Sequence, residues 1–157
     1  MLKPGAKAPE FVLANDQGGE TSLTDLLQDG PLILYFYPAD FTPGCTKEAC
    51  SIRDIHNDIQ AVGLQVAGVS PQDEESHQKF RAKHDLPFTL LSDPDKVAIK
   101  MYDVDGIFGV GVERATFLIN QDRIIQDAVS ANVLVGRHQE FIEKAVALRE
   151  AAGKRSD

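Results

Sequence analysis

Residues 31–50 read "PLILYFYPADFTPGCTKEAC", and this stretch decides the fold. Its first part, residues 31–38, is a continuous apolar run rich in β-forming residues, which is typical of a strand buried on both faces. Its second part leads into a helical pattern that carries both cysteines of the chain. In open α/β sheets, reactive groups lie beyond the carboxyl ends of the strands. We therefore expect "FTPGC", residues 41–45, at a functional edge of a sheet.

The rest of the chain alternates between apolar strand patterns and amphipathic helix patterns. Further strands are expected at residues 64–70, 115–120 and 123–130, and helices at residues 43–62, 73–84, 94–102 and 136–151. Residues 11–27 predict a short edge segment, a Gly-Gly turn and a helical turn capped by Thr21 or Ser22. With a hairpin turn at "NQDR", residues 120–123, this order indicates an α/β fold with a mixed central sheet flanked by helices. It resembles the thioredoxin-like fold with an N-terminal extension.

Length and charge limit the classes of function. A chain of 157 residues fits one domain, 1–157, and we expect a frayed tail from about residue 150. A net charge of -8 repels phosphate backbones, so we expect no nucleic-acid partner. No apolar run approaches the roughly 18 residues of a membrane span, and "MLKPGAKAPEF", residues 1–11, lacks the apolar region of a signal peptide. We therefore expect a cytoplasmic protein, and a monomer because no exposed apolar element stands out.

Cys45 is expected in the first turn of a helix. With Thr42 as N-cap and Pro43 as the first helical residue, Cys45 occupies the third helical position, where a capping box holds a carboxylate. A helix N-terminus stabilises a thiolate relative to a thiol, so Cys45 should ionise more readily than a free cysteine. Cys45 begins the apolar stripe of the helix, which continues through Ala49, Ile52, Ile55, Ile59 and Val62.

Cys50 lies on a different, polar face of the same helix. Five residues along an ideal helix separate the two Cα atoms by roughly 8.6 Å, whereas a disulfide tolerates no more than about 7 Å. The two sulfurs therefore cannot bond unless the first turns of the helix unwind. Because cytosolic thiols are kept reduced, no lasting structural disulfide is expected, and the cysteines are either inert or working thiols.

Two plainer interpretations compete with a working thiol. Cys45 could be a small core residue and Cys50 an incidental surface thiol, although the helix N-terminus and the end of a strand favour a reactive cysteine. Zinc needs about four ligands, and the histidines show no zinc-finger spacing. These histidines are His56, His77, His84 and His138.

The segment "YFYPADFTPGCTKEAC", residues 35–50, resembles the active-site segment of the peroxiredoxins, and especially of the peroxiredoxin Q or bacterioferritin comigratory group. The family motif of a proline, a threonine or serine and a cysteine falls on Pro38, Thr42 and Cys45. A distant arginine matches Arg114, and Cys50 matches the resolving cysteine of many members. The resemblance covers almost the whole chain. Two departures are the loop "DGIFGVGVER", which has no lysine, and the "NQDR" turn, which has no glycine.

The resemblance implies a thiol peroxidase that acts on hydrogen peroxide and alkyl hydroperoxides without a metal or organic cofactor. The Cys45 thiolate would attack a peroxide oxygen and become a sulfenic acid, which Cys50 would convert into a disulfide. Arg114, Thr42 and helix amides could stabilise the developing charge, and Pro38 would shield the thiolate from water. Thr42 has one proton, so it cannot both cap the helix and hold the peroxide, and the sequence leaves this choice open. Thioredoxin is the expected reductant, with a glutaredoxin-type donor as the alternative.

Blander roles exist for two of these residues. Pro38 could only end a strand, and Arg114 could only pair with Glu113 or Glu48. Another class of function is a thioredoxin-fold binding module whose cysteines act as a redox sensor. A protein thiol–disulfide oxidoreductase is disfavoured because the chain has no Cys-x-x-Cys pair.

Overall fold

The computed structural model describes residues 1–132 and 134–156, and its side chains up to residue 152. Seven strands form one sheet in the order β2-β1-β5-β4-β3-β6-β7. The strands are β1 Val12–Asn15, β2 Glu20–Ser22, β3 Leu32–Phe36, β4 Gln65–Ser70, β5 Thr89–Ser92, β6 Ala115–Ile119 and β7 Ile125–Ser130. Strands β3, β4 and β5 are parallel, whereas β1, β2, β6 and β7 pair antiparallel, so the sheet is mixed as predicted.

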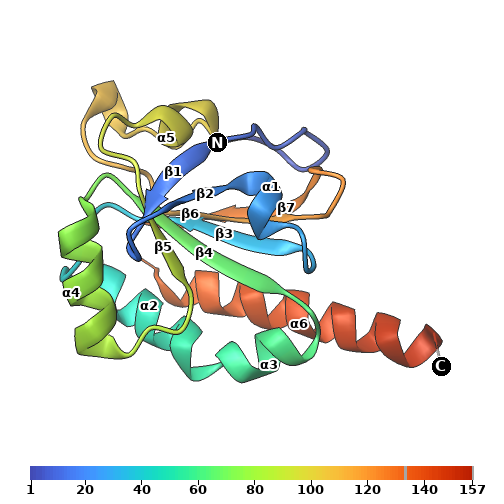
Figure 1. Cartoon of the computed structure of the whole chain (residues 1–157). Coiled ribbons are helices and arrows are strands. Elements are labelled where there is room, and N and C mark those ends of the chain that lie inside the picture. Colours follow the sequence, from blue (N-terminus) through green and yellow to red (C-terminus); the bar gives the residue numbers. More distant parts are fainter. Residues whose placement is uncertain (133, 157) are drawn as a thin grey trace.

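Helices cover both faces of this sheet (Figure 1). They are α1 Leu23–Leu26, α2 Pro43–Asp54, α3 His56–Ala61, α4 Glu74–His84, α5 Val97–Met101, the 3-10 turn η1 Ile107–Gly109 and α6 Gly136–Ser156. Helices α2, α3, α4 and α6 lie on one side, whereas α1, α5 and the N-terminal segment lie on the other. No helix in the described ranges is long and apolar enough to cross a membrane.

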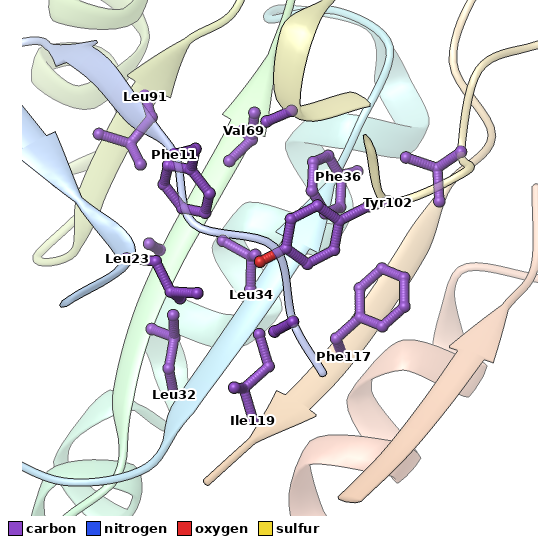
Figure 2. Close-up of a cluster of buried hydrophobic side chains, with 14 of the residues drawn as sticks. Phe11, Leu23, Leu32, Leu34, Phe36, Val69, Leu91, Tyr102, Phe117 and Ile119 are labelled. Atoms are coloured by element: carbon purple, nitrogen blue, oxygen red, sulfur yellow. The ribbon is translucent and has the colours of Figure 1, made fainter. Parts of the chain in front are cut away.

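Strand β3 stands at the centre of the sheet and supplies side chains to two cores. Leu32, Leu34 and Phe36 point to the face of α1 and α5, where Figure 2 shows them packed among aromatic rings. The alternate residues, Ile33 and Tyr35, point to the face of α2, α3, α4 and α6. All five side chains of β3 are buried, and each large apolar one contributes about 1.5–3 kcal/mol by leaving water. The rigid strand ends next to the segment that carries Cys45.

Several boundaries differ from the sequence prediction. The prediction of one helix over 43–62 is wrong, because Ile55 leaves helical geometry (φ -109°, ψ 9°) and its amide bonds to Ile52 through a tight turn. Strand β5 was not predicted. The predicted edge segment and Gly-Gly turn contain two strands, β1 and β2, which pair with each other across the turn. Of the two candidate caps, Ser22 caps α1 in a reciprocal pair with Asp25.

The last helix is longer than predicted. Helix α6 continues to Ser156, past the predicted end at residue 151 and into the segment that was expected to fray. Asp157, the end of that segment, lies outside the described residues.

Candidate active site

Cys45 lies in the first turn of α2, directly after the central strand. Thr42 is the N-cap in an extended conformation (φ -77°, ψ 149°) and Pro43 begins the helix, so Cys45 is the third helical residue, as predicted. Its side chain is 1% exposed and belongs to the core cluster between the sheet and α2. The sulfur is therefore withheld from bulk water at the positive end of a helix.

The Thr42 hydroxyl does not cap α2. It donates to the carbonyl oxygen of Ala39 at 3.1 Å instead. No side chain caps the first turn in the described part of the chain, and uncapped amides at a helix N-terminus attract an anion. The sequence left two roles open for the Thr42 hydroxyl: capping the helix or holding the peroxide. In this state the hydroxyl does not cap the helix.

Arg114 joins Cys45 across 69 positions of sequence. It directly precedes β6 and is 5% exposed, and its backbone amide is fixed by the side-chain oxygen of Asn132 at 2.7 Å. Its Nη2 donates to the Cys45 sulfur at 3.2 Å. A Cβ atom at position 44 would lie 3.2 Å from the same Nη2, so Gly44 keeps room for the guanidinium.

The second amino group of Arg114 binds Glu48, which lies one turn after Cys45 on α2. Nη1 of Arg114 is 2.8 Å from Oε1 of Glu48, and both side chains are buried. Burial raises the pKa of Glu48 to about 7, although the charge of Arg114 opposes this shift. Burial alone would lower the pKa of Arg114, but the negative charges of Glu48 and Cys45 outweigh it and raise that pKa. One cation thus serves two groups that can become anions.

His138, in the first turn of α6, lies behind Glu48. Its Nε2 is 2.9 Å from the Ala131 carbonyl oxygen, which only accepts, so Nε2 carries the proton. Its Nδ1 then accepts from the Thr116 hydroxyl at 2.8 Å and lies 3.5 Å from Oε2 of Glu48. Burial lowers the pKa of His138, so the ring is neutral near pH 7. This contact could not be predicted from the sequence, because a single histidine on a helix has many plainer roles.

Cys50 is half-buried on α2, and both cysteines are free. It is not in the core cluster that contains Cys45. Since α2 is regular between them, the ideal Cα separation of roughly 8.6 Å applies. The structure therefore holds the two thiols apart while α2 is intact.

Pro38 lies just after β3 and lines a cavity of about 500 Å³. Glu113 and Asn132, the neighbours that flank and fix Arg114, line the same cavity. Most of the loop 105–111 also lines this cavity. An open volume next to the arginine can admit a small polar substrate.

The loop 105–111 has no lysine of its own, but Lys96 holds it from outside. The ammonium of Lys96 donates to a carboxylate oxygen of Asp105 and to the carbonyl oxygens of Gly109 and Gly111, at 2.8–2.9 Å. Three apolar side chains of the loop are exposed, with Phe108 at 99%. The other two are Ile107 and Val110.

In the ranges that the structure describes, no group of three or more His, Cys, Asp and Glu side chains is arranged to hold a metal ion. The groups gathered at this site are the thiol of Cys45, the guanidinium of Arg114 and the first-turn amides of α2. Pro38, Thr42, Cys45 and Arg114 all lie at this carboxyl edge of the sheet, and Cys50 lies on the same helix further on.

Comparison with known proteins identifies the family of the chain. The sequence matches the AhpC/TSA family over residues 4–128. It is 42% identical over 133 residues to the peroxiredoxin Bcp of Bacillus subtilis (strain 168), which covers 80% of this chain and 84% of that protein. The structure of peroxidoxin BcpB from Mycobacterium tuberculosis matches with a TM-score of 0.87 and 34% identity, over 96% of this chain and 98% of that one.

The bacterioferritin comigratory protein of Xanthomonas campestris, whose structure concerns its alkyl peroxide reduction activity, matches with a TM-score of 0.80. It is 29% identical, and 97% of each chain is covered. The chain therefore belongs to the AhpC/TSA family and, within it, to the peroxiredoxins of the Bcp and Q group, which are peroxidases with a thioredoxin-like fold.

Proposed function

We propose that this peroxidase reduces hydrogen peroxide and alkyl hydroperoxides with Cys45, resolves the product with Cys50 in an intramolecular disulfide, and is recycled by thioredoxin. The observation that carries this proposal is the contact of 3.2 Å between Nη2 of Arg114 and the sulfur of Cys45. A guanidinium favours a thiolate by its charge, and its remaining donors can bind the oxygens of a peroxide.

The first step transfers one oxygen from the peroxide to sulfur. The Cys45 thiolate attacks the terminal oxygen, an S–O bond forms and the O–O bond breaks. The other oxygen leaves as alkoxide or hydroxide and takes up a proton, and Cys45 is oxidised to a sulfenic acid. Arg114 and the first-turn amides of α2 would stabilise the charge that develops on the two oxygens. Thr42 could turn its hydroxyl from the Ala39 carbonyl oxygen, 3.1 Å away, toward the peroxide.

The second step forms the disulfide. The sulfur of Cys50 attacks the sulfur of Cys45, the S–O bond breaks, and the hydroxide leaves as water with the proton from the Cys50 thiol. Because the intact helix separates the Cα atoms by roughly 8.6 Å, the first turns of α2 must unwind for this step. An external dithiol then reduces the disulfide and is itself oxidised, so that sulfur carries all the electrons.

The nature of the substrate and the reductant rests on family resemblance. The Xanthomonas campestris relative is described by its alkyl peroxide reduction activity, which favours alkyl hydroperoxides beside hydrogen peroxide for this chain. Thioredoxin is the proposed donor, and a glutaredoxin-type donor is the alternative. Cytoplasmic location and a monomeric state stay predictions.

The test is a coupled assay that follows NADPH consumption. Purified protein is given hydrogen peroxide or tert-butyl hydroperoxide with either a thioredoxin and thioredoxin reductase system or a glutaredoxin and glutathione system. Peroxide-dependent turnover with thioredoxin is expected for the wild type and none for Cys45→Ser. Oxidation of Cys45 without turnover in either system would favour the redox-sensor alternative, and insulin reduction would favour a thiol–disulfide oxidoreductase.

A further inference from the structure

A second buried ionisable pair, Asp40 and His77, lies beside the active site and takes no part in the steps above. Nδ1 of His77 is 2.7 Å from Oδ2 of Asp40, and both side chains are 0% exposed. On its other side, Nε2 of His77 is 3.0 Å from the Leu91 carbonyl oxygen, so this nitrogen must donate. The contact between Nδ1 and Oδ2 then holds one further proton, since two bare acceptors would repel each other. Such a pair is a strong hydrogen bond inside the protein.

Asp40 fastens residues 37–42, the loop that leads into α2, to the rest of the protein. Its Oδ1 accepts from the hydroxyl of Tyr37 at 2.7 Å, and its Oδ2 accepts from the hydroxyl of Ser76 at 2.7 Å. Its backbone amide donates to the side chain of Gln72 at 3.2 Å. Since Asp40 lies midway between Pro38 and Thr42, these bonds fix the entry to α2. Two of the partners, Ser76 and His77, belong to the first turn of α4.

The C-terminal end of α4 binds the C-terminal part of α2. Nη1 of Arg53, near the end of α2, donates to the carbonyl oxygen of His84, the last residue of α4, at 2.8 Å. Helix α4 therefore fastens the chain at residue 40 and again at residue 53. Both cysteines lie between these two points. The disulfide can close within the segment 41–52 while both fastenings persist.

We propose that Asp40 and His77 are positioning residues for the peroxidase reaction: they fix the start of the segment that unwinds, so that Thr42 and Cys45 return to Arg114 after each disulfide is reduced. This inference rests on the proposed intramolecular disulfide. Without the hydrogen bonds at residue 40, the wound (helical) form of the first turns of α2 becomes less stable, and the unwound form becomes more populated. The reaction of Cys45 with peroxide, which needs the wound form, should slow. The closure of the disulfide, which needs the unwound form, should become faster.

The test measures both rates in the same variants. Asp40→Ala removes the acceptors, whereas Asp40→Asn keeps an oxygen for Tyr37 and supplies an N–H for Nδ1 of His77. Asp16→Asn is the matched control, because the buried Asp16 pairs with Arg81 of α4 away from the segment 41–52. Peroxide reaction is measured by competition with a haem peroxidase, and disulfide closure by acid quench and mass spectrometry.

For Asp40→Ala, the loss of several buried hydrogen bonds predicts a peroxide reaction slower by about tenfold and a disulfide closure that is several-fold faster. Asp40→Asn should stay near the wild type in both rates, and Asp16→Asn should change neither. General destabilisation would not move the two rates in opposite directions. Two equal losses, or no change in either rate, would overturn the inference and leave the proposed function standing.

Hydrogen exchange on the wild type gives a second test that needs no variant to fold. In the disulfide form, amides of residues 46–51 should lose protection, whereas those of α4 and Asp40 should keep it. Loss of protection in α4 upon oxidation would overturn the inference. If the oxidised wild type contains no bond between Cys45 and Cys50, the proposed resolution step fails, and this inference fails with it.

Discussion

Replacing Glu48 by glutamine tests how one guanidinium serves two acidic groups. Arg114 lies 3.2 Å from the sulfur of Cys45 and 2.8 Å from Oε1 of Glu48. When Cys45 and Glu48 are both ionised, this buried cluster carries one positive and two negative charges. Glu48→Gln keeps an oxygen that can accept from Arg114 but removes one negative charge. The thiolate should therefore form at lower pH in the variant.

The size of the effect follows from the repulsion between the two anions. They lie on two sides of one guanidinium, so at roughly 7 Å and an effective dielectric constant of about 20 they repel by about 2 kcal/mol, or about 1.5 pH units. Since the pKa of Glu48 is about 7, the carboxyl is only partly charged near neutral pH, which reduces the shift. We expect the midpoint of the pH–rate profile for peroxide reduction to fall by about one pH unit.

The assay is competition for limiting peroxide between the reduced enzyme and a haem peroxidase, repeated between pH 4.5 and 9. The chain has no tryptophan, so tryptophan fluorescence cannot report its oxidation directly. A Cys50→Ser background keeps the measurement on the first step. Thr24→Val, on the far face of the sheet, serves as a control that should leave the midpoint unchanged.

Two results would refute the reasoning about Glu48. An unchanged midpoint would mean that the charge of Glu48 does not reach Cys45. A pH–rate profile with the wild-type midpoint but a rate at high pH that is lower by about a hundredfold would mean that the ionised carboxylate is needed to orient Arg114 toward the peroxide. In that case the main role of Glu48 would be orientation of the guanidinium.

Three further predictions concern the same cluster. Arg114→Lys should slow peroxide reduction by about a hundredfold even at high pH, because a lysine lacks the planar fork; full recovery at high pH in the same competition assay would show that Arg114 only favours ionisation. Cys45→Ser should abolish the first oxidation, whereas Cys50→Ser should keep it and accumulate a sulfenic acid that dimedone traps; the reverse pattern would exchange the two roles. Burial raises the pKa of Glu48 from 4.5 to about 7, so the folded state binds more protons in this interval and the free energy of unfolding should fall as pH rises through it. In urea titrations at pH 4.5 and 7.5, Glu48→Gln should lack this decrease, and an equal decrease in both proteins would contradict the pKa shift.

The central strand and the position of Cys45 could be predicted because local signals agree there. Apolar residues fill β3 without interruption, and the order Thr-Pro-Gly-Cys places the cysteine in a helix start whatever the rest of the chain does. The match of Arg114 came from family resemblance, because no local signal links residues that are 69 positions apart.

The missed features depend on contacts that a linear pattern does not carry. Strand β5 has only four residues, and it is a strand because it pairs with β4 and β1. The break at Ile55 leaves the apolar stripe uninterrupted in sequence, so periodicity could not reveal it. Two histidines on distant helices lie against these carboxyl groups: His138 is 3.5 Å from Glu48, and His77 is 2.7 Å from Asp40. Burial of such ionisable groups is decided by tertiary packing, which explains why no role for His138 and His77 could be read from the sequence.

In the loop 105–111, beside Pro38, the backbone conformation does not depend on the exposed side chains. These side chains can therefore be redesigned. Its backbone is fixed by Lys96 and by a close approach at Gly106, where a Cβ atom would lie 1.8 Å from the Val110 carbonyl oxygen. Its outward side chains, by contrast, contribute little to the core, because Ile107 and Val110, which line the cavity, are mostly exposed. A library of substitutions at these two positions should vary the border of the cavity at small cost in stability. Under the proposed function, natural or laboratory evolution could thus alter which peroxides reach the site without changing Cys45 or Arg114.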